Sequence, residues 1–286
     1  MRIFLFTFLN VFAKITKRFY KYNLRVITYH EIPDRAIFKR HLNYLKSNYS
    51  IIDLDTLKEH IENGKILPKY PLLITFDDGY KNIFTNAIPE LIDKKLPACI
   101  FIITSYVNSN LEFWWKSSLA YYDEISSKSK AAKKKNLLLK NIPNHERINL
   151  LNKIPNIPKE QITSTSFKQL EKHNISLCNH THTHPILDKC CVKEICQEIT
   201  LAQKCFDSWE ISGKNIFAYP NGNWTVEIEK ILNKKEIKLA FLFDHKINRK
   251  KINPLRISRL STNATMSIPE LSVKVAGLHS IISKIW

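Results

Sequence analysis

The most informative segment of this chain is Leu72-Leu73-Ile74-Thr75-Phe76-Asp77-Asp78-Gly79-Tyr80. Its first five residues form a short apolar run that predicts a strand, and two carboxylates follow at a turn where glycine permits an unusual backbone angle. The same order recurs at 25–29 before His30, at 175–179 before His180, His182 and His184, and at 216–220 before Asn221 and Gly222. Residues at the carboxyl ends of the strands of a (β/α) barrel converge on one face, where such barrels place their active sites. We therefore expect one site built from four segments.

Apolar runs and amphipathic segments alternate along most of the chain, which is typical of βα units with a mostly parallel sheet. A length of 286 residues suits a single α/β barrel with an insertion, although two smaller domains stay open as an alternative. The predicted strands are 24–29, 51–53, 71–76, 98–104, 175–178, 215–219, 238–243 and 255–260. Helical spacing of apolar residues predicts helices at 38–46, 57–63, 84–94, 167–173, 194–209, 226–235 and 269–283.

Residues 105–165 interrupt this alternation and are predicted to be a helical insertion. The segment is rich in lysine, above all over 128–140, and Trp114 and Trp115 lie near its start. The two indoles could line a substrate groove or anchor the insertion to the barrel, and the anchor is the favoured interpretation.

The composition indicates a globular protein with a strong positive charge. Apolar residues make up 44% of the chain, which excludes wholesale disorder, and 44 Lys and Arg against 26 Asp and Glu give a formal net charge of +18. Such a charge suggests nucleic acid or an anionic membrane as a partner, or a compositional bias spread over the chain. Because no recognisable nucleic-acid-binding module accompanies the charge, no nucleic acid partner is expected. The six cysteines include no C-x-x-C pair and are expected to be reduced.

The first 22 residues are predicted to form an amphipathic helix ahead of the barrel domain, which is expected to span residues 23–286. The apolar run from residue 3 to residue 15 is shorter than the roughly 20 residues that a transmembrane helix needs. Basic residues at 14, 17, 18 and 21 recur with helical spacing, which suits a helix lying in a membrane interface. A signal sequence and a helix that simply docks on the barrel are the alternatives. The expected location is cytoplasmic or peripheral on the cytoplasmic membrane, and extracytoplasmic if the segment is a signal sequence.

The Asp-Asp pair and the histidine cluster predict a metal site. At their turn the side chains of Asp77 and Asp78 diverge, so one carboxylate can bind a metal while the other handles protons; a plain solvated turn is the alternative. In His180-Thr181-His182-Thr183-His184 the outer histidines have metal-ligand spacing, whereas His182 would join them on a strand but face away on a helix. Two histidines and one carboxylate leave open positions on an ion, which is typical of a catalytic zinc.

Three motifs, in this order, resemble those of the polysaccharide deacetylase family, also called the NodB-homology group or carbohydrate esterase family 4. They are Thr-Phe-Asp-Asp-Gly-Tyr (75–80), His-Thr-x-Thr-His (180–184) and Phe-Ala-Tyr-Pro-x-Gly (217–222). Residues 27–32 and 253–260 are similar to one branch of that family, so the resemblance covers about residues 24–260. It implies a distorted, TIM-like (β/α) barrel of about seven units. It also implies metal-dependent removal of N-acetyl groups from amino sugars of a polysaccharide or glycan precursor.

The resemblance assigns roles to individual residues. The divalent ion, expected to be zinc, would be bound by Asp78, His180 and His184. Asp77 would be the general base that takes a proton from a water acidified by the ion. The backbone N–H of Asn221 would help to hold the oxyanion formed at the acetamide carbonyl.

Two parts of the family pattern are absent. Ala218 stands where many relatives have an arginine that steadies the catalytic aspartate, and either Arg259 or Arg256 could fill that space or simply pair on the surface. No late Leu-x-His motif supplies the histidine that protonates the leaving amine. His30, at a strand end, is a candidate for that role or a structural histidine, and His279 is a second candidate. A catalytically weak carbohydrate-binding relative of the same fold is therefore the alternative function.

Overall fold

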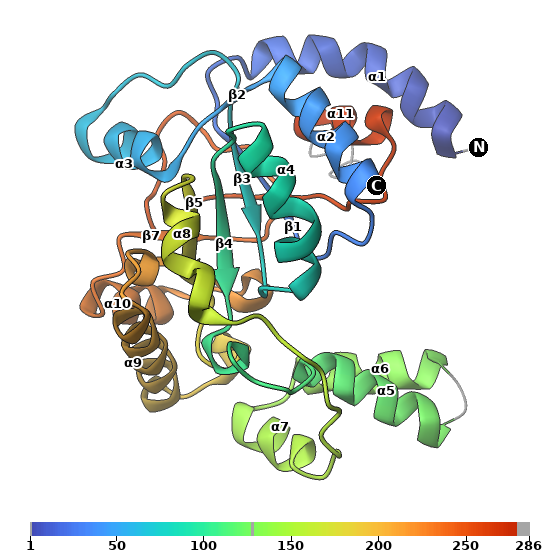
Figure 1. Cartoon of the computed structure of the whole chain (residues 1–286), viewed down its shortest axis with the longest axis vertical. Coiled ribbons are helices and arrows are strands. Elements are labelled where there is room, and N and C mark those ends of the chain that lie inside the picture. The colour runs from blue at the N-terminus through green and yellow to red at the C-terminus, as the bar shows by residue number, and fades with distance from the viewer. Residues whose placement is uncertain (1, 127–128, 279–286) are drawn as a thin grey trace.

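A parallel β-sheet lies at the centre of the computed structural model, which describes residues 2–126 and 129–278, and helices surround this sheet (Figure 1). Neighbouring strands follow the order β7-β6-β5-β4-β3-β1-β8, and β2 pairs with the start of β3. All these pairings are parallel. The strands are β1 (Arg25–Tyr29), β2 (Ser50–Ile51), β3 (Pro71–Phe76), β4 (Ala98–Ile102), β5 (Ile175–Asn179), β6 (Ile216–Ala218), β7 (Leu239–Phe241) and β8 (Leu260–Ser261).

The last part of the chain closes the sheet into a barrel because it contacts both edges. Ile257 forms a parallel bridge with Phe241 in β7, and Leu260 pairs with Ile27 in β1. These contacts complete a ring of seven strands, counted over the described residues, and confirm the predicted distorted (β/α) barrel. The strand predicted at 255–260 is wrong over most of its length. The chain turns just before and at the start of this range, where Oδ1 of Asn253 accepts from the N–H of Leu255. Ile257 then forms an isolated bridge with β7, and pairing with β1 starts at Leu260.

The helices begin where side chains can accept hydrogen bonds from free backbone N–H groups. Asp34, Asp53, Thr225 and Ser267 cap four of them in this way, and Gly64, with φ +69°, ends the second of those four. Around the barrel lie α2 (Arg35–Asn48), α3 (Leu54–Asn63), the π-helical turn Ile83–Ala87 with α4 (Ile88–Asp93), α8 (Phe167–Glu171), α9 (Val192–Trp209), α10 (Val226–Lys234) and α11 (Ile268–Val275).

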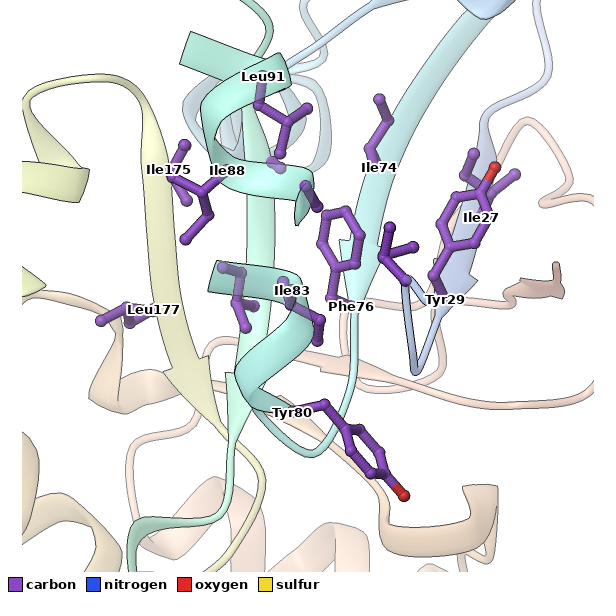
Figure 2. Packing of buried hydrophobic residues seen from close by; sticks show 14 of the residues in the cluster. Ile27, Tyr29, Ile74, Phe76, Tyr80, Ile83, Ile88, Leu91, Ile175 and Leu177 are labelled. Atoms are coloured by element: carbon purple, nitrogen blue, oxygen red, sulfur yellow. The ribbon is translucent and has the colours of Figure 1, made fainter. Parts of the chain in front are cut away.

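Alternate residues of the strands enter two different cores. Figure 2 shows one of them, in which Ile74 and Phe76 of β3 meet Ile83, Ile88 and Leu91 of the segment that leads into and forms α4. The opposite side chains fill the barrel interior, among them the following buried residues: Val26, Leu73, Cys99, Phe101, Cys178, Ala218 and Phe241. Burial on both faces explains why the strand sequences are almost uninterrupted apolar runs.

Within the predicted insertion at about 105–165, the described residues form three α-helices. They are α5 (Trp114–Ser126), α6 (Ser129–Leu139) and α7 (Asn144–Leu151). Helices α5 and α6 lie side by side at the lower end of the molecule in Figure 1, beyond the carboxyl end of β4. The helical character predicted for this segment is therefore correct.

Helix α1 (Arg2–Phe19) packs along α11, at the end of the molecule where the strands begin (Figure 1). Arg25, fully buried at the start of β1, holds the carboxyl ends of both helices. Its Nε donates to the Val275 carbonyl at 2.8 Å and its Nη1 to the Tyr20 carbonyl at 2.9 Å, which satisfies groups that helix ends leave free. Among the described helices, none combines the length and apolar character needed to cross a bilayer.

Candidate active site

Asp78, His180 and His184 meet at the carboxyl ends of β3 and β5. Nε2 of His180 lies 3.4 Å and Nε2 of His184 3.6 Å from Oδ1 of Asp78. One ligand atom from each residue lies within 4.8 Å of the others, and all three residues are buried. The three residues named as metal ligands from the sequence are thus brought together in space.

The backbone of these segments is unusual in the way that sites often require. Asp78, Thr181 and His184 have φ values of +69°, +69° and +59°, in the left-handed region that non-glycine residues seldom adopt. The turn is held by Asn179, whose Oδ1 accepts from the Thr181 N–H at 2.8 Å, and by Thr181, whose Oγ1 accepts from the His184 N–H at 3.0 Å. These bonds direct both imidazoles to one side.

The ring nitrogens of the two histidines fit metal binding. Nδ1 of His180 donates to the Ala218 carbonyl at 2.9 Å, which leaves its Nε2 free to act as a ligand. Burial, together with nearby His180, lowers the pKa of His184 to about 3, so its imidazole stays neutral, as a metal ligand must be. Two imidazoles and one carboxylate are a donor set that suits a divalent ion such as zinc.

His182 takes no part in this cluster. Its Nδ1 lies 2.8 Å from Oγ1 of Thr104, and its backbone N–H donates to Oε2 of Glu198 at 2.9 Å. The imidazole therefore faces away from Asp78. Of the two possibilities left open by the spacing, His182 is the histidine that does not join His180 and His184.

Asp77 is bound by Arg259 at the floor of the site. Nη1 donates to Oδ1 at 2.6 Å and Nη2 to Oδ2 at 2.8 Å, while Nε of Arg259 donates to the Leu242 carbonyl. Burial alone would raise the pKa of Asp77, but the guanidinium and nearby His180 hold it below its usual range. Arg256 lies elsewhere, paired with Glu229 at 2.6 Å. Of the two arginines, Arg259 occupies the position opposite the aspartate.

His30 stands beside Asp77 at the mouth of the site. Its Nε2 lies 3.9 Å from Oδ2 of Asp77, and its side chain is 41% exposed. The centroids of the His30 and Phe243 rings lie 5.6 Å apart in a T-shaped arrangement. The imidazole thus reaches solvent while facing the carboxylate. His279 lies outside the described residues.

A pocket of about 390 Å³ opens over the candidate metal ligands and Asp77. Its other lining residues are His30, Tyr80, Trp115, Lys140, Tyr219, Asn221, Gly222 and Phe243. The two indoles of the insertion have different surroundings: Trp115 lies 4.8 Å from the His184 ring and lines the pocket, whereas Trp114 is buried and donates to the His184 carbonyl. Trp114 thus anchors the insertion to the barrel, as predicted, whereas Trp115 faces the pocket and its contact with a substrate stays a prediction.

Asn221 and Gly222 form one wall of this pocket. Asn221 has φ +58° and turns its side-chain amide toward Asn223. Gly222 has φ +77°, and a Cβ there would lie 2.6 Å from Cβ of Phe243, so only glycine fits. The pocket wall thus depends on the close approach of the backbone at Gly222, after β6, to the backbone at Phe243, after β7.

Sequence reasoning missed Tyr80, Lys140, Tyr219 and Phe243 as pocket residues. Tyr80 follows the Asp-Asp-Gly turn and Tyr219 lies in the Phe-Ala-Tyr-Pro segment, so their positions beside motif residues were an available signal. Lys140 comes from the insertion, and nothing in its local sequence separates it from its many neighbouring lysines.

The fold and the site define a (β/α) barrel with a candidate metal centre at the carboxyl ends of its strands. The family model described as polysaccharide deacetylase matches residues 64–240, more than half of the chain. The chain belongs to this family.

Solved structures share the fold at low sequence identity. The Streptococcus pyogenes deacetylase PplD, in complex with acetate, is 16% identical, with a TM-score of 0.65 over 90% of this chain and 99% of that one. IcaB from Ammonifex degensii is 18% identical, with a TM-score of 0.64 over 89% of this chain and 95% of that one. The poly-beta-1,6-N-acetyl-D-glucosamine N-deacetylase of Escherichia coli K12 is 27% identical over 95 residues, which are 29% of this chain and 14% of the E. coli protein. The match thus spans a small part of that relative's length.

Proposed function

We propose that this chain is a metal-dependent N-deacetylase that hydrolyses acetamide groups on amino sugars of a polysaccharide or glycan precursor. One observation carries the proposal: the cluster of Asp78, His180 and His184 shares a single pocket with a buried Asp77–Arg259 pair. Family membership supports the reaction class, and the similarity to the E. coli poly-beta-1,6-N-acetyl-D-glucosamine N-deacetylase supports N-acetylglucosamine as the sugar.

The two adjacent carboxylates have different tasks in this mechanism. A divalent ion, expected to be zinc, would be held by Asp78, His180 and His184 and would supply Lewis acidity toward the acetamide and its attacking water. Asp77 accepts the proton of that water. Arg259 keeps the Asp77 carboxylate ionised at neutral pH and fixes both of its oxygens, so the base has one orientation toward the pocket.

The leaving amine needs a proton, and His30 is the group we assign to donate it. It lines the pocket, reaches solvent, and its Nε2 lies 3.9 Å from Oδ2 of Asp77. The backbone N–H of Asn221, which also lines the pocket, is the proposed second donor to the oxyanion. Trp115 and Tyr80 offer apolar ring surface against which a sugar ring can pack.

The test combines metal analysis with acetate release from N-acetylglucosamine oligomers. We expect Asp77→Asn to retain the metal and lose turnover by roughly 100-fold or more, since the base alone is removed. We expect Asp78→Ala combined with His180→Ala to lose both. His182→Gln is the matched control, because it alters the same loop outside the cluster and should change neither.

Two outcomes contradict the proposal. Metal bound with full occupancy by the Asp78→Ala, His180→Ala variant would show that these residues are not its ligands. Glycan binding without acetate release, unaffected by Asp77→Asn, would favour the catalytically weak binding relative, a function suggested by the absent Leu-x-His motif.

A further inference from the structure

Helix α1 has a docked face and an exposed face of very different character. On the docked face Ala13 is buried against Val273 and Ala276, with Phe6 and Leu9 packed beside it. The exposed face carries the following apolar side chains with their exposed fractions: Phe8 64%, Val11 63%, Phe12 46%, Ile15 54% and Phe19 81%. We call these five residues the apolar stripe.

The apolar stripe follows helical geometry. Its members are spaced i, i+3, i+4, i+7 and i+11, which places them within about 100° of the helix circumference. Single exposed apolar residues are ordinary on protein surfaces, but a contiguous stripe with three phenylalanines marks an interaction surface. The stripe cannot turn inward, because the opposite face of α1 is packed and Arg25 holds its carboxyl end.

Positive charge borders the stripe on one side. Lys14 and Arg18 are exposed at that border, and residues 2–19 contain no Asp or Glu. A cavity of about 290 Å³ lies between this border and the barrel, lined by Lys14, Lys17 and Arg18 and by polar side chains that include Tyr44 and Asn48. The helix therefore presents apolar side chains and cations side by side, with room for an anionic group among the cations.

We propose that α1 is an interfacial helix that docks this protein on an anionic lipid surface. The apolar stripe enters the acyl boundary, while the exposed Lys14 and Arg18 meet lipid phosphates. The charge and the apolar character of α1 together favour a lipid surface over a protein partner. A protein partner would need acidic groups beside an apolar groove of matching shape, whereas an anionic bilayer offers negative headgroups and an apolar interior along the whole helix. The inference goes beyond the proposed deacetylase activity and does not depend on it.

Docking through α1 determines which way the pocket faces. The backbone carbonyl of Lys21, just after α1, accepts from the N–H of Tyr70, which precedes β3, so the helix lies where β3 begins. Asp77 lies where β3 ends, and Figure 1 shows α1 and the insertion helices α5 and α6 at opposite ends of the molecule. On a membrane the pocket would face away from the lipid and take a glycan that extends from the surface.

The test is co-sedimentation with vesicles of phosphatidylcholine alone and of phosphatidylcholine with about one quarter phosphatidylglycerol. We expect binding to the anionic vesicles that weakens with salt. Phe8→Asn, Phe12→Asn and Phe19→Asn together should weaken it at least tenfold. Lys14→Gln with Arg18→Gln should weaken it roughly 25-fold, about fivefold for each cation removed.

A matched control replaces exposed apolar residues away from α1: Ile66→Asn, Val192→Asn and Val226→Asn, which are 86%, 48% and 56% exposed in the native protein. It should bind vesicles like the native protein. Urea unfolding and acetate release from soluble oligomers should be unchanged in all these variants, which separates failure of this proposal from failure of the proposed activity. Absence of vesicle binding overturns the proposal. So does a dimer in sedimentation velocity that the stripe variant abolishes without any vesicle binding.

Discussion

Arg259 donates two parallel hydrogen bonds to Asp77, from Nη1 to Oδ1 at 2.6 Å and from Nη2 to Oδ2 at 2.8 Å. The two residues are 182 positions apart in the sequence. Both side chains are buried, with exposed fractions of 0% and 4%. A guanidinium matches both carboxylate oxygens at once, which a lysine ammonium does not. The pair therefore fixes the charge and the direction of the proposed base together.

Loss of this guanidinium should damage stability and turnover. We expect Arg259→Met to lower the free energy of unfolding by about 3 to 5 kcal/mol, because it leaves a buried carboxylate without its partner. Arg259→Lys should keep the charge but recover only part of the turnover. Urea unfolding and acetate release measure the two effects.

Arg256→Met is the matched control for that series. Arg256 and Glu229 form a partly exposed pair, so their separation should change stability by only about 0 to 1 kcal/mol. Native stability in Arg259→Met would contradict the importance given to the buried pair.

The wall formed by Gly222 should tolerate no side chain. Gly222→Ala forces a Cβ to within 2.6 Å of Phe243 at a φ of +77°, and we expect a loss of about 1 to 3 kcal/mol in stability. Turnover should fall because Asn221 shifts, while metal content stays native. Gly64→Ala, at φ +69° with open space around it, should lose some stability but no turnover.

Trp115 should contribute to substrate affinity. Removal of its ring in Trp115→Ala takes away pocket surface next to His184, and we expect KM for N-acetylglucosamine oligomers to rise by roughly fivefold to tenfold. Tyr121→Ala, which alters the same helix outside the pocket, is the control. Equal KM values for the two variants would argue against a sugar contact at Trp115.

Stability should fall below neutral pH in part because of His41, a buried residue that is not part of the candidate metal cluster. Burial lowers the pKa of His41 below 6.5, so at mildly acidic pH the unfolded chain binds a proton that the folded protein does not. His41 therefore contributes stability above pH 6.5 that is lost as pH falls below it.

Urea unfolding at several pH values tests this contribution. We expect His41→Gln to flatten the pH dependence by up to about 1.4 kcal/mol per pH unit between the pKa of folded His41 and 6.5. His173→Gln, at an exposed position, is the comparison. An unchanged slope in His41→Gln would assign the pH dependence to other histidines.

The parts of the fold and site that the sequence predicts are those that depend on neighbouring residues. β3 was predicted with its observed bounds because both faces of the strand are buried and its apolar run is unbroken. Asp78, His180 and His184 were recognisable because each follows such a run closely. The distance between them in space then follows from the rule that parallel strands end on one face.

The remaining features depend on distant contacts. The choice between Arg259 and Arg256 stayed open because both precede β8 by a few residues, and only the irregular closure of the barrel decides which one faces inward. His182 stayed open because its direction depends on the hydrogen bonds of the turn. Lys140 reaches the pocket because of how the insertion packs, and no pattern in the residues around it indicates this position.

The separation of Asp77 and Arg259 along the chain sets an order of assembly during synthesis. All three proposed metal ligands have left the ribosome once residue 184 has emerged, but the guanidinium that charges and orients the base arrives only with residue 259. Until then the Asp77 carboxylate keeps its hydration, because burying it alone would cost several kcal/mol. A nascent chain that stops short of Arg259 therefore contains the three proposed ligands but lacks the partner of the proposed base, so the Asp77–Arg259 pair is among the last parts of the site to form.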